Sequence, residues 1–75
     1  MEKIKQIISN DGRHRLDVEL IDSGLYRYVT FDDRYRNDPD FQNPPEWTIS
    51  DVSGIYETLE ATEFDAIAKL AWLRD

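Results

Sequence analysis

The sequence predicts an α+β domain, in which a three- to four-stranded antiparallel β-meander carries one C-terminal α-helix packed on its apolar face. Three observations predict this fold class. Apolar and polar residues alternate through the first half of the chain, turn residues interrupt the alternation at 10–12 and 22–24, and the apolar period becomes helical near the C-terminus. A length of 75 residues suits a single domain, 1–75, with one hydrophobic core.

Three strands are expected at about 3–9, 13–22 and 25–33. They are rich in residues that favour pleated sheet, and the segments between them hold the Asp-Gly and Ser-Gly pairs that tight hairpins use. A bulged loop around Asp11-Gly12-Arg13 makes the first connection odd in length. A two-residue turn at Ser23-Gly24 makes the second connection even. Together the two connections set the register of the sheet.

This register assigns every side chain to a face, because a slip of one residue inverts a strand. We expect the helix to cover Ile4, Ile8, Leu16, Val18, Leu20, Val29 and Phe31, with the stem of Arg27 on the same side. The outer face then holds Ile7, Ile21, Tyr26 and Tyr28 beside Lys5, Glu19 and Thr30. Cross-strand charge pairs of Lys5 with Glu19 and of Arg15 with Asp32 agree with this assignment.

Residues 34–46 show no period and hold all three prolines, which predicts a loop. A short fourth strand is expected at 47–52. A helix follows at about 59–73, with Thr58 as its N-cap or, alternatively, a later start at Thr62. Its apolar stripe should face the sheet and comprises Ala61, Phe64, Ile67, Ala68 and Ala71, with Leu70 and Trp72 at the margins and Thr62, Lys69 and Leu73 opposite.

Charge and composition limit the function. The net charge is −7, and the excess lies entirely in residues 31–75, which carry eleven acidic and four basic side chains. Such a field repels nucleic acid and anionic membranes and attracts basic surfaces, although it also serves solubility. The absence of cysteine and of an apolar signal-peptide stretch favours a cytoplasmic location.

Catalytic and metal-binding signals are weak. His14 is the only histidine, so no zinc site and no serine triad is expected, and no cofactor motif is present. Asp32, Asp33, Asp38 and Asp40 lie near one loop, but their spacing does not match an EF-hand. A small enzyme that uses paired carboxylates is therefore the least favoured alternative.

We expect a small non-catalytic protein-binding domain, monomeric or homodimeric, whose partner is another protein with a basic surface. The contact residues predicted on the outer sheet face and in loop 34–46 are Ile7, Ile21, Tyr26, Tyr28, Tyr35, Phe41 and Trp47. The alternative is an acidic inhibitor that mimics nucleic acid, as some phage anti-defence proteins do. Its acidic surface would be Asp38, Asp40, Glu46, Glu57, Glu60, Glu63 and Asp65.

Overall fold

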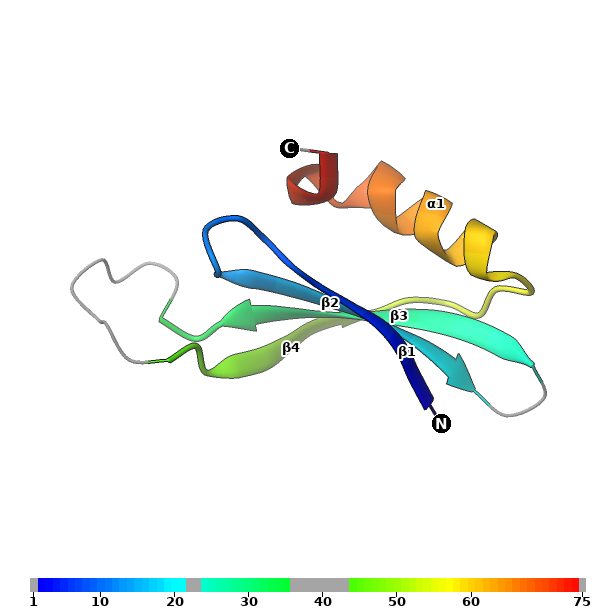
Figure 1. The fold of residues 1–75 in the computed structure, drawn as a ribbon, viewed down its shortest axis with the longest axis horizontal. Coiled ribbons are helices and arrows are strands. Elements are labelled where there is room, and N and C mark those ends of the chain that lie inside the picture. Colours follow the sequence, from blue (N-terminus) through cyan, green and yellow to red (C-terminus); the bar gives the residue numbers. More distant parts are fainter. Residues whose placement is uncertain (1, 22–23, 36–43, 75) are drawn as a thin grey trace.

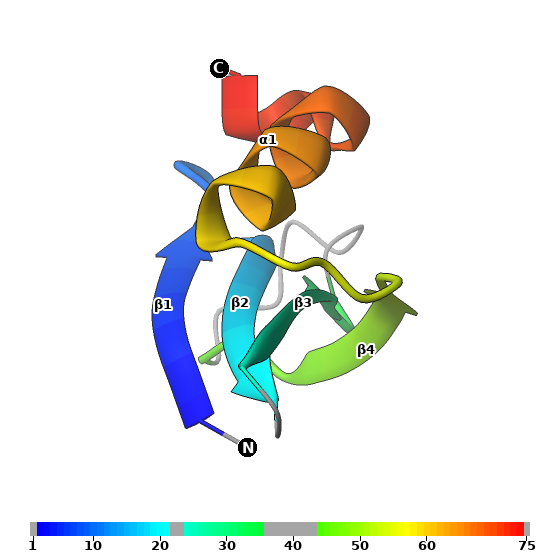
Figure 2. The same ribbon diagram turned by 90° about the vertical axis from the view of Figure 1, so that its right-hand side faces the viewer.

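The computed structural model describes residues 2–21, 24–35 and 44–74 of the chain. Four strands, β1 (Glu2–Ile8), β2 (His14–Ile21), β3 (Leu25–Asp33) and β4 (Trp47–Val52), form one antiparallel sheet in sequence order. Helix α1 (Leu59–Lys69) and the 3-10 helix η1 (Ala71–Arg74) follow, and Figure 1 shows both on one side of the sheet. Figure 2 shows α1 above the middle of the sheet, with β1 and β4 at its edges. The predicted α+β fold is confirmed.

The first hairpin has a different register from the one expected. The Ser9 amide donates to the His14 carbonyl at 2.9 Å, so the loop spans 10–13 and is one residue longer than predicted. Asp11 holds this loop by accepting from the Ser9 hydroxyl at 2.5 Å and from the Arg13 amide at 3.0 Å. Gly12 adopts a positive φ of 73°, which glycine tolerates best.

This shift moves β1 side chains between faces. Ile7, rather than Ile8, lies opposite Leu16 and packs against the core, whereas Ile8 is 47% exposed. A bulge at Ile4 changes the register again and leaves that side chain 42% exposed. The predicted Lys5–Glu19 pair is wrong, because Lys5 lies opposite Val18 and its ammonium group contacts Glu63 at 3.0 Å.

The second hairpin is also shifted by one residue. Ile21 pairs with Leu25, so the connection is longer than a two-residue turn and Tyr28, not Val29, lies opposite Val18. Because the side-chain period of a strand is two, every β3 side chain changes face. Tyr28 lies on the helix side and is only 3% exposed, whereas Arg27 lies on the other face beside Glu19, at 2.8 Å. The prediction that Tyr28 is an outer-face residue is wrong.

The core lies between the sheet and α1. Its fully buried members are Leu16, Val18, Tyr28 and Ala66, and partly buried side chains surround them: Ile7, Tyr56, Leu59, Leu70, Trp72 and Leu73. Among the described residues, five hydrophobic side chains are buried and seven large ones are exposed. So small a core leaves a considerable apolar surface without cover.

Helix α1 starts at the predicted N-cap but ends earlier than expected. The Thr58 hydroxyl accepts from the Ala61 amide at 3.1 Å, which selects Thr58 over Thr62. The helix ends at Lys69, and Leu70 adopts an extended conformation before η1 begins. The Arg74 guanidinium in the following turn donates to the Ile67 and Ala68 carbonyls at 3.0 and 2.9 Å. These bonds satisfy carbonyl groups that have no partner within the helix at its C-terminal end.

The buried stripe of α1 is not the predicted one. Thr62 and Ala66 are fully buried against the sheet, whereas Phe64 is 77% and Ile67 47% exposed. Thr62 and Ala66 recur at helical spacing with Leu59 and Leu70 and form a second, mainly apolar stripe on the helix. This second stripe, and not the predicted one, packs against the sheet. Thr62 fits there because its hydroxyl donates to the Thr58 carbonyl at 2.8 Å.

Candidate functional site

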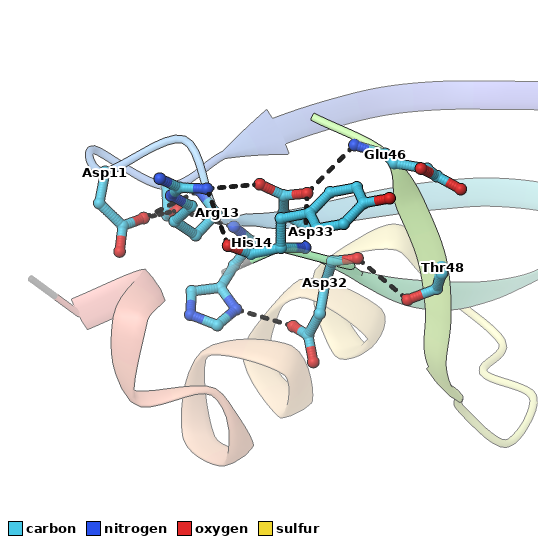
Figure 3. Close-up of polar contacts among 9 residues, drawn as sticks. Asp11, Arg13, His14, Asp32, Asp33, Glu46 and Thr48 are labelled. Carbon is cyan, nitrogen blue, oxygen red and sulfur yellow. Dashed lines mark hydrogen bonds and ion pairs between the residues drawn. The ribbon is translucent and has the colours of Figure 1, made fainter. Parts of the chain in front are cut away.

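Asp33 organises a polar cluster at one end of the sheet (Figure 3). One carboxylate oxygen accepts the amides of Tyr35 and Glu46, both at 3.1 Å, and the other accepts Arg13 at 2.7 Å. The side chain is 3% exposed. Burial opposes its ionisation, but these hydrogen bonds outweigh burial and hold the pKa of Asp33 below its ordinary value. Asp33 therefore fixes both ends of the connection between β3 and β4 to the first hairpin.

The depressed pKa of Asp33 makes stability depend on pH. A carboxylate with a folded pKa below its unfolded value stabilises the protein above the unfolded pKa, about 3.9 for aspartate, and this contribution is lost as the pH falls through the folded pKa. We expect Asp33→Asn to melt at a lower temperature than wild type at pH 6, and the difference to shrink by pH 2. Thermal melts followed by circular dichroism would measure it. A difference that does not change with pH would contradict this assignment.

His14 connects the sheet to the C-terminal turn. Its Nδ1 lies 2.7 Å from Asp32 Oδ1, and its ring stacks on the Trp72 indole with 5.8 Å between centroids and 16° between planes. The sequence did not predict this contact, because the expected register placed Arg15, not His14, opposite Asp32. With a three-residue connection between Ile21 and Leu25 in place of the two-residue turn, the sequence would have paired His14 with Asp32.

A hollow of about 410 Å³ lies beside this stack and is lined by Ser9, Asn10, Asp11, His14 and Trp72. Ser9 in this hollow already makes two hydrogen bonds. Its hydroxyl donates to Asp11 and accepts a hydrogen bond from the His14 amide at 3.0 Å. Nucleophilic catalysis by a serine–histidine pair needs a serine hydroxyl that donates to the imidazole. The contacts of Ser9 instead hold the hairpin, so this cluster supports the fold rather than acyl transfer.

A second polar cluster ties α1 to the segment before it. The Tyr56 hydroxyl donates to Asp65 Oδ2, and Lys69 lies 3.0 Å from the same oxygen. The hydrogen bond to Asp65 raises the pKa of Tyr56, while the bonds from Tyr56 and Lys69 lower the pKa of Asp65. The raised pKa keeps Tyr56 protonated as the donor in this network, which suits a structural role.

The seven predicted contact residues do not share a surface. Ile7, Tyr26 and Tyr28 lie on the helix side of the sheet, and Tyr28 is part of the core. Ile21 and Trp47 lie on the other side, Tyr35 begins the connection to β4, and Phe41 lies outside the described residues. Ile7, Ile21, Tyr26 and Tyr28 were expected together on the outer sheet face. That placement was wrong for Ile7, Tyr26 and Tyr28 because it depended on the register of β1 and β3.

The predicted acidic surface is largely engaged in ion pairs where it is described. Three of its carboxylates contact a basic side chain: Glu46 with Arg34 at 3.2 Å, Glu63 with Lys5 at 3.0 Å and Asp65 with Lys69 at 3.0 Å. Glu57 and Glu60 are exposed. Asp38 and Asp40 lie outside the described residues.

The sheet face away from α1 is here called the open sheet face. It consists of three cross-strand rows and a neighbouring tryptophan: Ile8, Arg15, Phe31 and Ile49; Gln6, Asp17, Val29 and Val52; Lys3, Glu19 and Arg27; and Trp47. No other described helix or strand lies on this side of the sheet (Figures 1 and 2). Ile49 is 65% exposed, and Ile8 and Val52 are nearly half exposed.

The second apolar surface is the outer face of α1, here called the helix outer face: Ala61, Phe64, Ile67 and Ala68, all exposed. A groove of about 170 Å³ adjoins it and is lined by Ile7, Leu16, Ala66, Ile67 and Leu73, with Lys5 and Glu63 also contributing. Glu60 lies on the same outer surface of the helix as Phe64, one turn earlier. The helix outer face is thus apolar with acidic neighbours.

Comparisons with protein-family models, with curated proteins and with solved structures give no match to this chain. No helix in the described part of the chain is long and apolar enough to cross a membrane. Within residues 2–21, 24–35 and 44–74, no group of three or more His, Cys, Asp or Glu side chains is arranged to hold a metal ion. The interpretation of function therefore depends on the surfaces themselves.

Proposed function

We propose that this chain is a non-catalytic protein-binding domain that acts through the helix outer face. The observation that carries the proposal is the 77% exposure of Phe64 on a helix whose opposite side packs against the core. Ile67, one turn along the helix outer face, borders the apolar groove. An exposed aromatic side chain near such a groove is a typical binding hot spot, because a partner can bury a large area at one point. A cytoplasmic location stays part of this proposal.

The partner that fits is a protein segment with a large apolar side chain and flanking Lys or Arg residues. The groove is apolar along its floor, where Leu16 and Ala66 lie, and an apolar side chain would bury there without losing a hydrogen bond. Exposed Glu57 and Glu60 and the net charge of −7 favour a basic partner. A second copy of the chain fits this face poorly, because both copies would bring the same acidic neighbours together.

A non-catalytic role is supported because the side chains with shifted pKa values make hydrogen bonds that hold the fold together. Asp33 holds the β3–β4 connection, and Asp65 and Tyr56 hold α1. The nucleic-acid mimic is less well supported, since Glu46, Glu63 and Asp65 are ion-paired. A mimic would bind much more weakly at high salt, whereas burial of Phe64 and Ile67 predicts a modest salt dependence.

Phe64→Glu is expected to weaken partner binding by about thirtyfold or more, which corresponds to loss of a hot-spot side chain worth about 2 kcal/mol. A partner captured by the tagged protein would be purified and its dissociation constant measured by calorimetry. Ile55→Glu is the matched control, because Ile55 is 63% exposed outside the helix. Both variants should melt like wild type. Equal binding of Phe64→Glu and wild type, or no capture by wild type, would overturn the proposal.

A further inference from the structure

The open sheet face combines exposed apolar side chains with charges that are already paired. Arg15 and Asp17 form a bidentate pair, with distances of 2.9 and 2.6 Å, and Arg27 contacts Glu19 at 2.8 Å. Arg15 also covers the Phe31 ring, with its guanidinium carbon 4.6 Å from the ring centroid. Charges paired within one chain cost less to desolvate than charges that need a partner to neutralise them. The charged groups on this face therefore add little desolvation cost when the face is buried.

The charge of the open sheet face also differs from that of the whole chain. The basic side chains Lys3, Arg15 and Arg27 balance the acidic Asp17, Glu19 and, opposite Trp47, Asp33, so the face has no acidic excess. Among the described residues, the acidic excess therefore lies outside this face. A second copy can approach this face without the repulsion that it would meet at the acidic surfaces.

The edges of the sheet are poor surfaces for self-association. Both edge strands carry a bulge, at Ile4 in β1 and at Ser50 in β4. Bulges at an edge disrupt the ladder of free backbone groups and discourage pairing with another sheet. Association of two copies is thus directed away from the edges and toward the face.

From these observations we propose that two copies of the chain form a dimer by packing their open sheet faces together. Ile8, Phe31, Ile49 and Val52 of each copy form the apolar centre, and the paired Arg15–Asp17 groups lie among them. The two sheets would stack about 10 Å apart, as sheets do in β-sandwiches. A standard interface takes about 800 Å² from each partner, which is about a sixth of the 5128 Å² surface of this chain. Both helices remain outside, so the dimer does not depend on the proposed partner.

The first test is the mass of the protein in solution. Sedimentation equilibrium from 5 to 500 μM should give a dimer of twice 8.9 kDa for the wild type. Ile49→Lys places a charge on both sides of the two-fold axis and should raise the dimer dissociation constant at least tenfold. Ile55→Lys, at a residue of similar exposure outside this face, should dimerise like wild type. A wild type that stays monomeric, an unaffected Ile49→Lys, or a disrupted Ile55→Lys would each overturn the proposal.

A second measurement locates the interface without a substitution. In a mixture of isotopically labelled and unlabelled wild type, intermolecular NOEs should connect Ile49, Phe31 and Ile8 across the dimer. Intermolecular NOEs from Phe64 or along β4 backbone amides would instead indicate a helix-face or edge dimer and overturn the proposal. Loss of partner binding in Phe64→Glu would leave this result unchanged, so the two proposals fail separately.

Discussion

Tyr28→Ala should leave a large fraction of the protein unfolded at 37 °C. The ring is 3% exposed, belongs to the core with Leu16, Val18 and Ala66, and stacks on Tyr56 with 6.1 Å between ring centroids. Truncating a buried aromatic side chain costs about 3–5 kcal/mol. A chain of 75 residues has a total stability of only about 4–11 kcal/mol at the usual value per residue. Urea denaturation followed by circular dichroism would measure the loss.

Two variants control for the Tyr28→Ala result. Tyr28→Phe keeps the ring and should cost about 1 kcal/mol or less, since it removes only the hydroxyl. Tyr26→Ala removes the neighbouring, partly exposed tyrosine of the same face and should cost less than Tyr28→Ala. A Tyr28→Ala protein as stable as wild type would favour the register expected from the sequence, in which this ring lies on the outer face.

Arg15→Met is expected to destabilise the fold by about 2–4 kcal/mol, somewhat less than the roughly 3–5 kcal/mol for breaking a fully buried pair. The side chains of Arg15 and Asp17 are 19% and 6% exposed, so removing the guanidinium leaves the Asp17 carboxylate buried and unpaired. The hydrogen bond to Asp17 raises the pKa of Arg15, which keeps the guanidinium charged. Guanidinium chloride denaturation is the measurement, made at a protein concentration low enough to keep the chain monomeric.

A double variant separates the charge from the packing of Arg15. Arg15→Met combined with Asp17→Asn removes the unpaired carboxylate, so it should be more stable than Arg15→Met alone. A double variant that is no more stable than Arg15→Met would show that the guanidinium stabilises the protein mainly by covering Phe31 and Trp47, at 4.6 and 5.9 Å.

The candidate surfaces were only partly predictable, and the residues show why. The exposed stripe of α1, with Phe64 and Ile67, was recognised as apolar but assigned to the core. The helix has a second stripe through Leu59, Thr62, Ala66 and Leu70, and periodicity alone does not rank two such stripes. Thr62 occupies the buried one because the backbone of the preceding turn satisfies its hydroxyl.

The sequence by itself determined the α+β class and the order of four strands and a helix, because alternation and turn residues act over a few neighbouring residues. The choice of Thr58 over Thr62 as the N-cap came from the structure. The tertiary structure decided which side of each strand and helix is buried. Loop 10–13 is one residue longer than its turn signal indicates, and Ile21 pairs directly with Leu25. One residue in each connection inverts a strand face, so Tyr28 entered the core and Phe31 left it. Contacts with residues distant in sequence decide which side is buried: Tyr28 of β3 shares the core cluster with Ala66 of α1.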